Sequence, residues 1–192
     1  MMVLIAGLML AAADPASQFP PGLEYNERRE TYPVRGSTRR ELRSALRHAQ
    51  ASEVDEGDGG GSVARTAQDL GMRYELEPVP GGCRLKGLVV SLDVTIHLPE
   101  WAHDGSPPKS IAEDWQRMRD ALERHEEGHR DIAVDSARYL HEGLTGLGVQ
   151  DSCQDLRREA QRVFFRAQLR HSVRDGAYER RTRHGIAQGA VL

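Results

Sequence analysis

The chain has 192 residues, of which 39% are hydrophobic and 29% charged, and its formal net charge is −3. These values predict one globular domain with a modest core and argue against a fibrous or disordered polymer. Because the net charge is small and negative, the whole molecule has no general attraction to nucleic acid. We therefore expect no nucleic-acid partner.

The first residues bear on the compartment. Residues 3–13 form a run of apolar and small side chains that ends in Ala11, Ala12 and Ala13. A bilayer-spanning helix needs about 20 such residues, but a run of this length suits a signal peptide with a small-residue cleavage site. We predict a signal peptide over residues 1–13, a secreted or periplasmic location and no stable membrane insertion afterwards. No Lys or Arg precedes the run, so a buried N-terminal strand or helix is the alternative.

The two cysteines bear on the same question. Cys83 and Cys153 are far apart in sequence and form no C-x-x-C pair. In an exported protein two such cysteines are expected to form one disulfide. The alternative is two buried thiols.

We expect a single domain over residues 31–192, preceded by a lead-in segment. Residues 14–30 contain three prolines and little apolar pattern, which predicts an extended lead-in. A short strand is expected over 30–34. Thr38 and Glu41 then have the spacing of a capping box, which predicts a helix through about Gln50. The acidic, glycine-rich residues 51–62 are expected to form a loop.

Two strands follow in the sequence. Residues 64–77 are expected to be extended, and a turn around residues 80–82 follows them. Over residues 90–98 apolar and polar side chains alternate, which is typical of a half-buried strand in an antiparallel sheet. Pro99 is expected to end this strand.

A long helix is the clearest expected element. Ser110 and Glu113 have capping-box spacing, and we expect the helix to run to about Leu144. Apolar residues recur along it at helical spacing before two histidines: Ile111, Trp115, Met118 and Leu122, then His125 and His129. A further helix is expected over residues 152–174, with a glycine-punctuated tail from 176 to 192. The predicted fold is α+β and zincin-like, with a small antiparallel sheet packed on the long helix.

The segment His125-Glu126-Glu127-Gly128-His129 predicts a metal site. Histidines four residues apart on a helix lie on one face, about one turn apart, and can bind one zinc ion. The ion lowers the pKa of a bound water towards about 7, and Glu126 is placed to act as the general base. The alternative is a surface pair of histidines held by nearby charged side chains.

A third ligand is needed, and the sequence offers several. Asp135 has the spacing of a metzincin ligand, but the helix pattern continues through Ile132 and turns Asp135 away, so we exclude it. Glu159 on the next helix and His184 in the tail are the candidates, with His171 a weaker one. The remaining histidines are expected at surface positions: His48, His97, His103 and His141.

Several short motifs carry a family resemblance. They comprise Tyr32-Pro33-Val34-Arg35-Gly36, Ala64-Arg65-Thr66, Cys83, Leu98-Pro99, Trp115, the histidine segment, Cys153, and the tail from Tyr178 to Gly185 followed by Gln188-Gly189-Ala190. From about residue 31 to 190 the chain resembles a bacterial domain family of unknown function described as predicted secreted zinc-dependent proteases. The resemblance implies that Cys83 and Cys153 are bonded and that His184 completes the metal site. Glu179 stands where the family's tail pattern usually has Asp.

The tail offers two further side chains. The Tyr178 phenol could donate a hydrogen bond to an oxyanion during catalysis, and the alternative is a core tyrosine that anchors the tail. Glu179 could orient a ligand imidazole through its free N–H.

Five arginines recur every four residues on the expected third helix: Arg158, Arg162, Arg166, Arg170 and Arg174. They indicate either a site for an anionic partner or a solvated face, and we favour the solvated face. Phe164 and Phe165 are expected to face the core.

These patterns together predict a secreted or periplasmic zinc-dependent metallohydrolase, a peptidase acting on peptides or proteins with Glu126 as general base. An amide other than a protein backbone, such as a peptidoglycan cross-link, is a weaker alternative substrate. The alternative from another class is a non-catalytic envelope module whose zinc is structural, held by four protein ligands.

Overall fold

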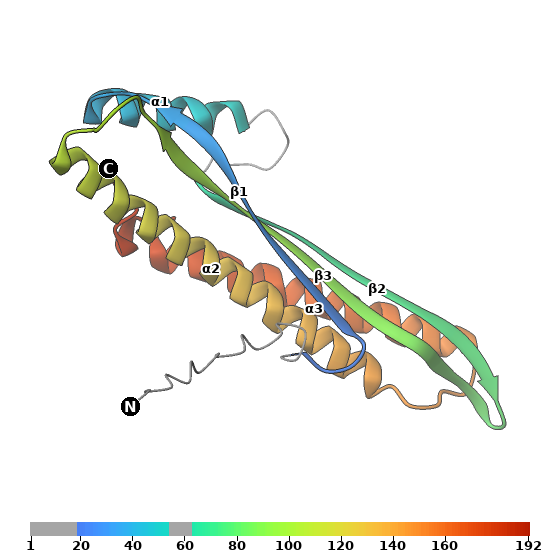
Figure 1. The fold of residues 1–192 in the computed structure, drawn as a ribbon. Helices are drawn as coiled ribbons and strands as arrows, with labels where there is room; N and C mark the ends of the chain where they lie inside the picture. The colour runs from blue at the N-terminus through green and yellow to red at the C-terminus, as the bar shows by residue number, and fades with distance from the viewer. Residues whose placement is uncertain (1–18, 54–62) are drawn as a thin grey trace, which may run out of the picture.

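A computed structural model of the chain describes residues 19–53 and 63–192 (Figure 1). The predicted signal peptide and most of the predicted acidic loop lie outside these residues. The elements in chain order are β1 (Leu23–Arg35), α1 (Arg39–Glu53), β2 (Arg65–Val79), β3 (Gly82–Ala102), α2 (Lys109–Thr145), α3 (Cys153–Thr182) and the short 3-10 helix η3 (Ile186–Gln188). The α+β class is confirmed.

The three strands form a mixed sheet in the order β1-β3-β2. β2 and β3 are an antiparallel hairpin, whereas β1 lies parallel to β3. The prediction of an antiparallel sheet was therefore wrong for β1. Alternation of apolar and polar residues indicates that one face of a strand is buried, but it carries no information on strand direction.

Two strands extend further than predicted, β1 at its start and β3 at its end. β1 begins at Leu23, inside the predicted lead-in, and β3 continues past Pro99 to Ala102. Pro99 is opposite Tyr32 of β1, while the register with β2 ends where Arg65 meets His97. At Pro99, therefore, β3 is paired with β1 only and has a free edge on the other side. A sheet tolerates a residue without an N–H at such an edge.

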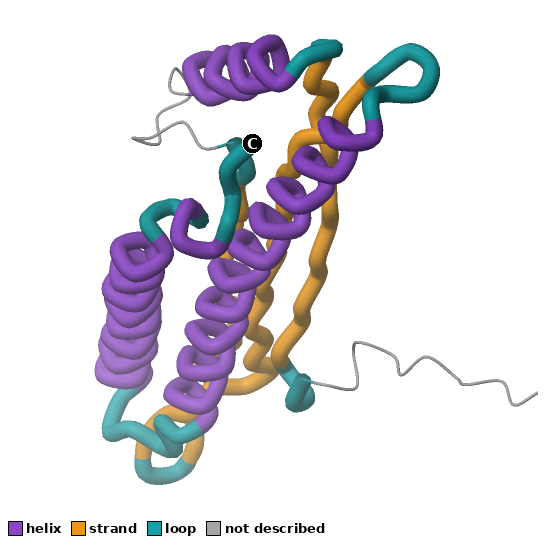
Figure 2. Tube along the Cα trace, turned by 90° about the vertical axis from the view of Figure 1, so that its left-hand side faces the viewer, coloured by secondary structure: helices purple, strands orange, loops and turns teal. Residues whose placement is uncertain are grey.

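The core lies between the sheet and α2. The alternating side chains of β3 that face α2 are essentially inaccessible: Val90, Leu92, Val94, Ile96 and Leu98. α2 lies along the sheet, and α3 packs beside α2 with further contacts to β2 and β3 (Figures 1 and 2). The predicted half-buried strand and the predicted apolar stripe of the long helix thus form one interface.

The helix starts show which capping predictions hold. In α1 the Thr38 hydroxyl accepts a hydrogen bond from the Glu41 N–H at 3.2 Å, which confirms the first capping box. α2 instead begins after Pro108 with no side-chain cap, so the predicted box of Ser110 and Glu113 was wrong. The Pro108 carbonyl accepts from the N–H groups of the first turn, and proline presets the backbone angle needed there.

α3 is longer than predicted. It starts at Cys153 with Ser152 as its N-cap and continues through Gly176 to Thr182. A glycine inside a helix costs about 1 kcal/mol relative to alanine, which tertiary packing can offset. Here the following turn carries the buried Tyr178. The predicted helix end at residue 174 was therefore wrong, and the first part of the tail is helical.

A disulfide joins Cys83 at the start of β3 to Cys153 at the start of α3. His141, expected at the surface, is buried on α2, with Nε2 3.1 Å from the Pro21 carbonyl oxygen. Among the described residues, no helix is both long and apolar enough to cross a membrane.

Candidate metal centre

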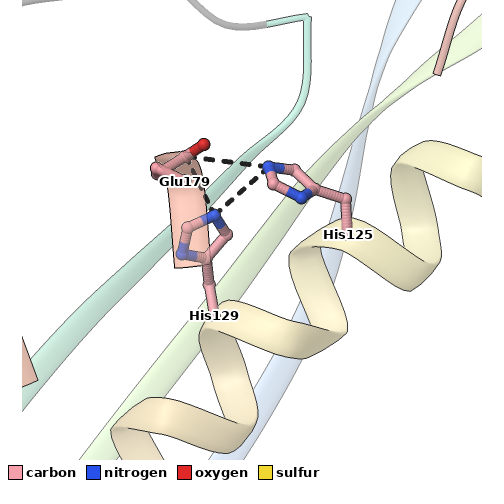
Figure 3. A group of neighbouring side chains, drawn as sticks. All are labelled: His125, His129 and Glu179. Carbon is pink, nitrogen blue, oxygen red and sulfur yellow. Dashed lines mark hydrogen bonds and ion pairs between the residues drawn. The ribbon is translucent and has the colours of Figure 1, made fainter. Parts of the chain in front are cut away.

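Three side chains from two helices converge beside the middle of α2 (Figure 3). His125 and His129 extend from α2, and their Nε2 atoms are 3.3 Å apart. Glu179 extends from α3 and places Oε1 3.0 Å from Nε2 of His129 and 3.6 Å from Nε2 of His125. The three ligand atoms lie within 4.8 Å of one another. Two imidazole nitrogens and a carboxylate oxygen so arranged are suited to one metal ion.

The other ring nitrogen of each histidine is held by the protein. The Gln188 side-chain oxygen lies 2.9 Å from Nδ1 of His125. Oδ1 of Asp175, one turn before Glu179 on α3, lies 2.5 Å from Nδ1 of His129. Because each acceptor favours a proton on Nδ1, both Nε2 lone pairs are directed toward the shared space.

Electrostatics distinguish the two imidazoles. Burial lowers the pKa of His125, and the neighbouring His129 lowers it further. Burial also acts to lower the pKa of His129, but the hydrogen bond and charge of Asp175, together with the charges of Glu126 and Glu179, outweigh it, so that this pKa is raised. The same contact lowers the pKa of Asp175. In the metal-free pair, His129 is therefore the imidazole that protonates first as pH falls.

Glu126 lies beside this group as a buried carboxylate, with 2% of its surface exposed. The Thr66 hydroxyl on β2 donates a hydrogen bond to Oε2 at 2.8 Å. Burial raises the pKa of Glu126, and the hydrogen bond from Thr66 opposes this rise only in part. A carboxylate with a raised pKa is better matched to proton transfer near neutral pH.

Tyr178 packs against the histidines. Its ring stacks on that of His125, with centroids 5.2 Å apart, and its hydroxyl donates to the His125 backbone oxygen at 3.1 Å. A Cβ at position 128 would lie 2.1 Å from this hydroxyl, so the close approach requires Gly128. Since its hydrogen is directed at the backbone, the geometry favours the anchoring role of Tyr178 over the oxyanion role.

The structure places the other predicted ligands differently. The His184 side chain is 78% exposed, with Nδ1 2.9 Å from Oε2 of Glu179, so it contacts the carboxylate oxygen that the histidines do not. Glu159 pairs with Arg162 at 2.5 Å and lies about 30 Å from Glu179 along the helix axis. His171 contacts Gln68. Neither Glu159 nor His171 belongs to the three-donor group found among the described residues.

Sequence reasoning missed three contributors to this site: Asp175, Gln188 and Thr66. Asp175 and Glu179 are four residues apart, a spacing that brings both to one helix face. That signal was present in the sequence, but it has meaning only if α3 continues through Gly176.

The fold and site together define an α+β domain whose long helix carries an H-E-x-x-H segment facing a carboxylate from a second helix. A family model described as bacterial protein of unknown function (DUF922) matches residues 29–185, and the chain belongs to this family. The match covers the two histidines, Glu126, Asp175, Tyr178 and Glu179. No curated protein and no solved structure gives a significant match to the chain. The family description names no activity, so proteolysis stays a prediction.

Proposed function

We propose that the chain is a zinc-dependent metallohydrolase that cleaves peptide bonds, with His125, His129 and Glu179 as its metal ligands. The observation that carries the proposal is the convergence of two Nε2 atoms and Oε1 of Glu179. Asp175 and Gln188 hold the Nδ1 atoms, an arrangement typical of histidines that bind metal through the other nitrogen.

The donor set fits zinc. Two neutral imidazoles and one carboxylate are the protein ligands of a well-known class of catalytic zinc sites, in which the fourth position is left open. When bound, zinc supplies Lewis-acid chemistry and lowers the pKa of a water molecule. Without the ion, the Nε2 atoms of the buried His125 and the largely buried His129 would face each other at 3.3 Å with no positive charge between their lone pairs.

Glu126 is the general base in this proposal. It is adjacent to His125 in sequence, it is buried, and Thr66 holds one of its carboxylate oxygens. Its raised pKa favours accepting a proton from the attacking water and returning it to the leaving amine. Tyr178 shapes the site by packing on both imidazole rings.

The disulfide supports an extracytoplasmic location for this activity, because disulfides persist mainly in oxidising compartments. We accordingly propose secretion or a periplasmic location, with peptides or proteins as substrates.

Metal content tests the ligand set. We expect the purified chain to hold one zinc ion by elemental mass spectrometry, and Glu179→Ala to lose it. Glu159→Ala, on the same helix but paired with Arg162, is the matched control and should retain zinc. His184→Ala decides between Glu179, proposed here as the third ligand, and His184, which the family resemblance implies. Zinc retained by Glu179→Ala but lost from His184→Ala would restore His184, and a wild-type chain that binds no zinc refutes the proposal.

A second experiment separates catalysis from structure. Glu126→Gln should keep zinc and lower hydrolysis of a peptide library by about 10²–10⁴-fold, the usual range for a general base. A structural zinc predicts instead that a chelator unfolds the protein. Loss of the circular dichroism signal on chelation, with no hydrolysis at any stage, would favour the non-catalytic module.

A further inference from the structure

The side of α3 that faces away from α2 carries three exposed apolar side chains. Phe165, Leu169 and Val173 are 65%, 54% and 61% exposed. Residues four apart on a helix lie next to one another, so the three form one continuous row. The prediction that Phe165 faces the core was wrong, whereas Phe164 does pack against the core. We call the row and its flanking side chains the α3 outer face.

The row has a basic flank and an uncharged flank. Beside this row of residues spaced four apart, one flank carries Arg162, Arg166 and Arg170, and the other carries Gln168 and Ser172. No acidic residue occurs in α3 between Glu159 and Asp175. Arg162 pairs with Glu159, and Arg170 lies over the Tyr139 ring, where its charge is not neutralised. Arg166 is exposed and pairs with no acidic side chain among the described residues.

We propose that the α3 outer face docks on the surface of an anionic lipid bilayer. A helix with an apolar row bordered by arginines is of the kind that lies in the plane of a membrane interface. The arginines would meet lipid phosphates, and each basic side chain near such a surface adds to the attraction. α3 is straight and lies at one side of the molecule, where no other described element covers its outer side (Figure 2).

Charge argues against a second copy of the chain as the occupant. In a two-fold pair of antiparallel α3 helices, each basic flank would adjoin the basic flank of the partner helix. Adjoining arginines of like charge would destabilise such a pair, whereas an anionic surface attracts all of these arginines.

The docked orientation has a consequence that rests on the proposed function. Glu179 lies about 9 Å beyond Val173 along the same helix. Docking would therefore hold the candidate metal centre close to the bilayer, and membrane-proximal polypeptides would be its substrates.

Vesicle sedimentation tests the proposal directly. We expect the purified, disulfide-bonded chain to sediment with vesicles of phosphatidylcholine and phosphatidylglycerol at low salt, and less at high salt. Pure phosphatidylcholine vesicles should bind it weakly. Leu169→Asp should weaken binding to the anionic vesicles at least about tenfold, since it removes an apolar contact and adds a repelled charge. Val149→Asp, an equally exposed apolar position outside α3, is the matched control and should bind as wild type does.

The basic flank has its own pair of variants. Arg166→Gln with Arg170→Gln should weaken binding and reduce its salt dependence, while Arg73→Gln, at an exposed arginine of β2, should not. Circular dichroism checks that each variant is folded. The proposal is overturned by absent binding to anionic vesicles, or by equal effects of Leu169→Asp and Val149→Asp. Self-association in ultracentrifugation, or capture by polyglutamate, without vesicle binding would assign the face to a protein instead.

Discussion

The partners of the two Nδ1 atoms are the residue-level feature that separates this site from a pair of buried histidines. Asp175 and Gln188 come from α3 and η3, and both accept from imidazoles of α2. Acceptors of this kind fix the ring orientation and strengthen the Nε2 donor toward a metal. Residues of α3 and η3 thus fix the orientation of two rings that belong to α2.

Removal of the Asp175 charge should be visible in two measurements. Asp175→Asn should lower zinc affinity by about 10–100-fold, the usual cost of losing such a partner, measured by competition with a chromophoric chelator. It should also lower the pKa of His129 in the metal-free protein, measured by NMR titration, because Asp175 is the main group that raises it.

Zinc binding should be weaker at acidic pH. Zinc must displace a proton from His129, so binding by the wild type weakens as pH falls through the raised pKa of His129. In Asp175→Asn this loss should begin at lower pH. Asp135→Asn, which removes a carboxylate paired with Arg174, is the control and should leave both quantities unchanged. An unaltered His129 titration in Asp175→Asn would contradict the assigned hydrogen bond.

How far the site could be predicted depends on how local each contact is. The histidine pair and Glu126 follow from spacing along one helix. Glu179 was expected only to orient a ligand imidazole, because its approach to both Nε2 atoms depends on how α3 crosses α2. Thr66 contributes because β2 packs against α2 at Glu126. The residue pattern of one strand does not indicate which part of a distant helix it will contact.

At the scale of the secondary-structure element, two glycines inside helices differ in what an added Cβ would contact. Gly128 allows the Tyr178 hydroxyl to approach α2, whereas a Cβ at Gly176 would meet only the flexible end of Arg180, at 3.4 Å. Position 128 therefore sets the spacing between α2 and α3 at the metal centre, and position 176 does not.

Alanine at these two positions should have opposite effects. Gly176→Ala should stabilise the fold by about 0.5–1 kcal/mol, the ordinary gain of alanine over glycine in a helix. Gly128→Ala should destabilise it by about 1–3 kcal/mol, because overpacking against Tyr178 outweighs that gain. Urea denaturation measures both, and zinc affinity should fall only in Gly128→Ala. Stabilisation by both substitutions would mean that Tyr178 does not pack against position 128.

The elements show why some boundaries were predicted and others not. Capping in α1 is a contact between residues three apart and was recognised from the sequence. The same pattern at Ser110 had no counterpart, because Pro108 already starts α2. β1 was largely missed since its exposed polar residues, such as Glu24 and Arg28, gain their strand geometry from pairing with β3.

At the scale of the whole molecule, the disulfide ties the two layers together at one end. Cys83 lies near the start of β3 and Cys153 begins α3, and the backbone of Cys83 also exchanges two hydrogen bonds with Gln150. The metal centre lies toward the other end of α3. Because these two connections share no residues, their contributions to stability should be close to additive.

The disulfide closes a loop with a sequence separation of 70, which in the chain-entropy model stabilises the fold by about 4 kcal/mol. The double variant Cys83→Ala with Cys153→Ala should therefore lose about that much in urea denaturation, plus a smaller cost for the cavity left at the fully buried Cys83. Reductant should destabilise the wild type and leave the variant unchanged. Zinc stoichiometry of the folded variant should match the wild type, since no cysteine belongs to the ligand group. Loss of zinc from a variant that remains folded would instead show that the disulfide holds α3 in position along its whole length.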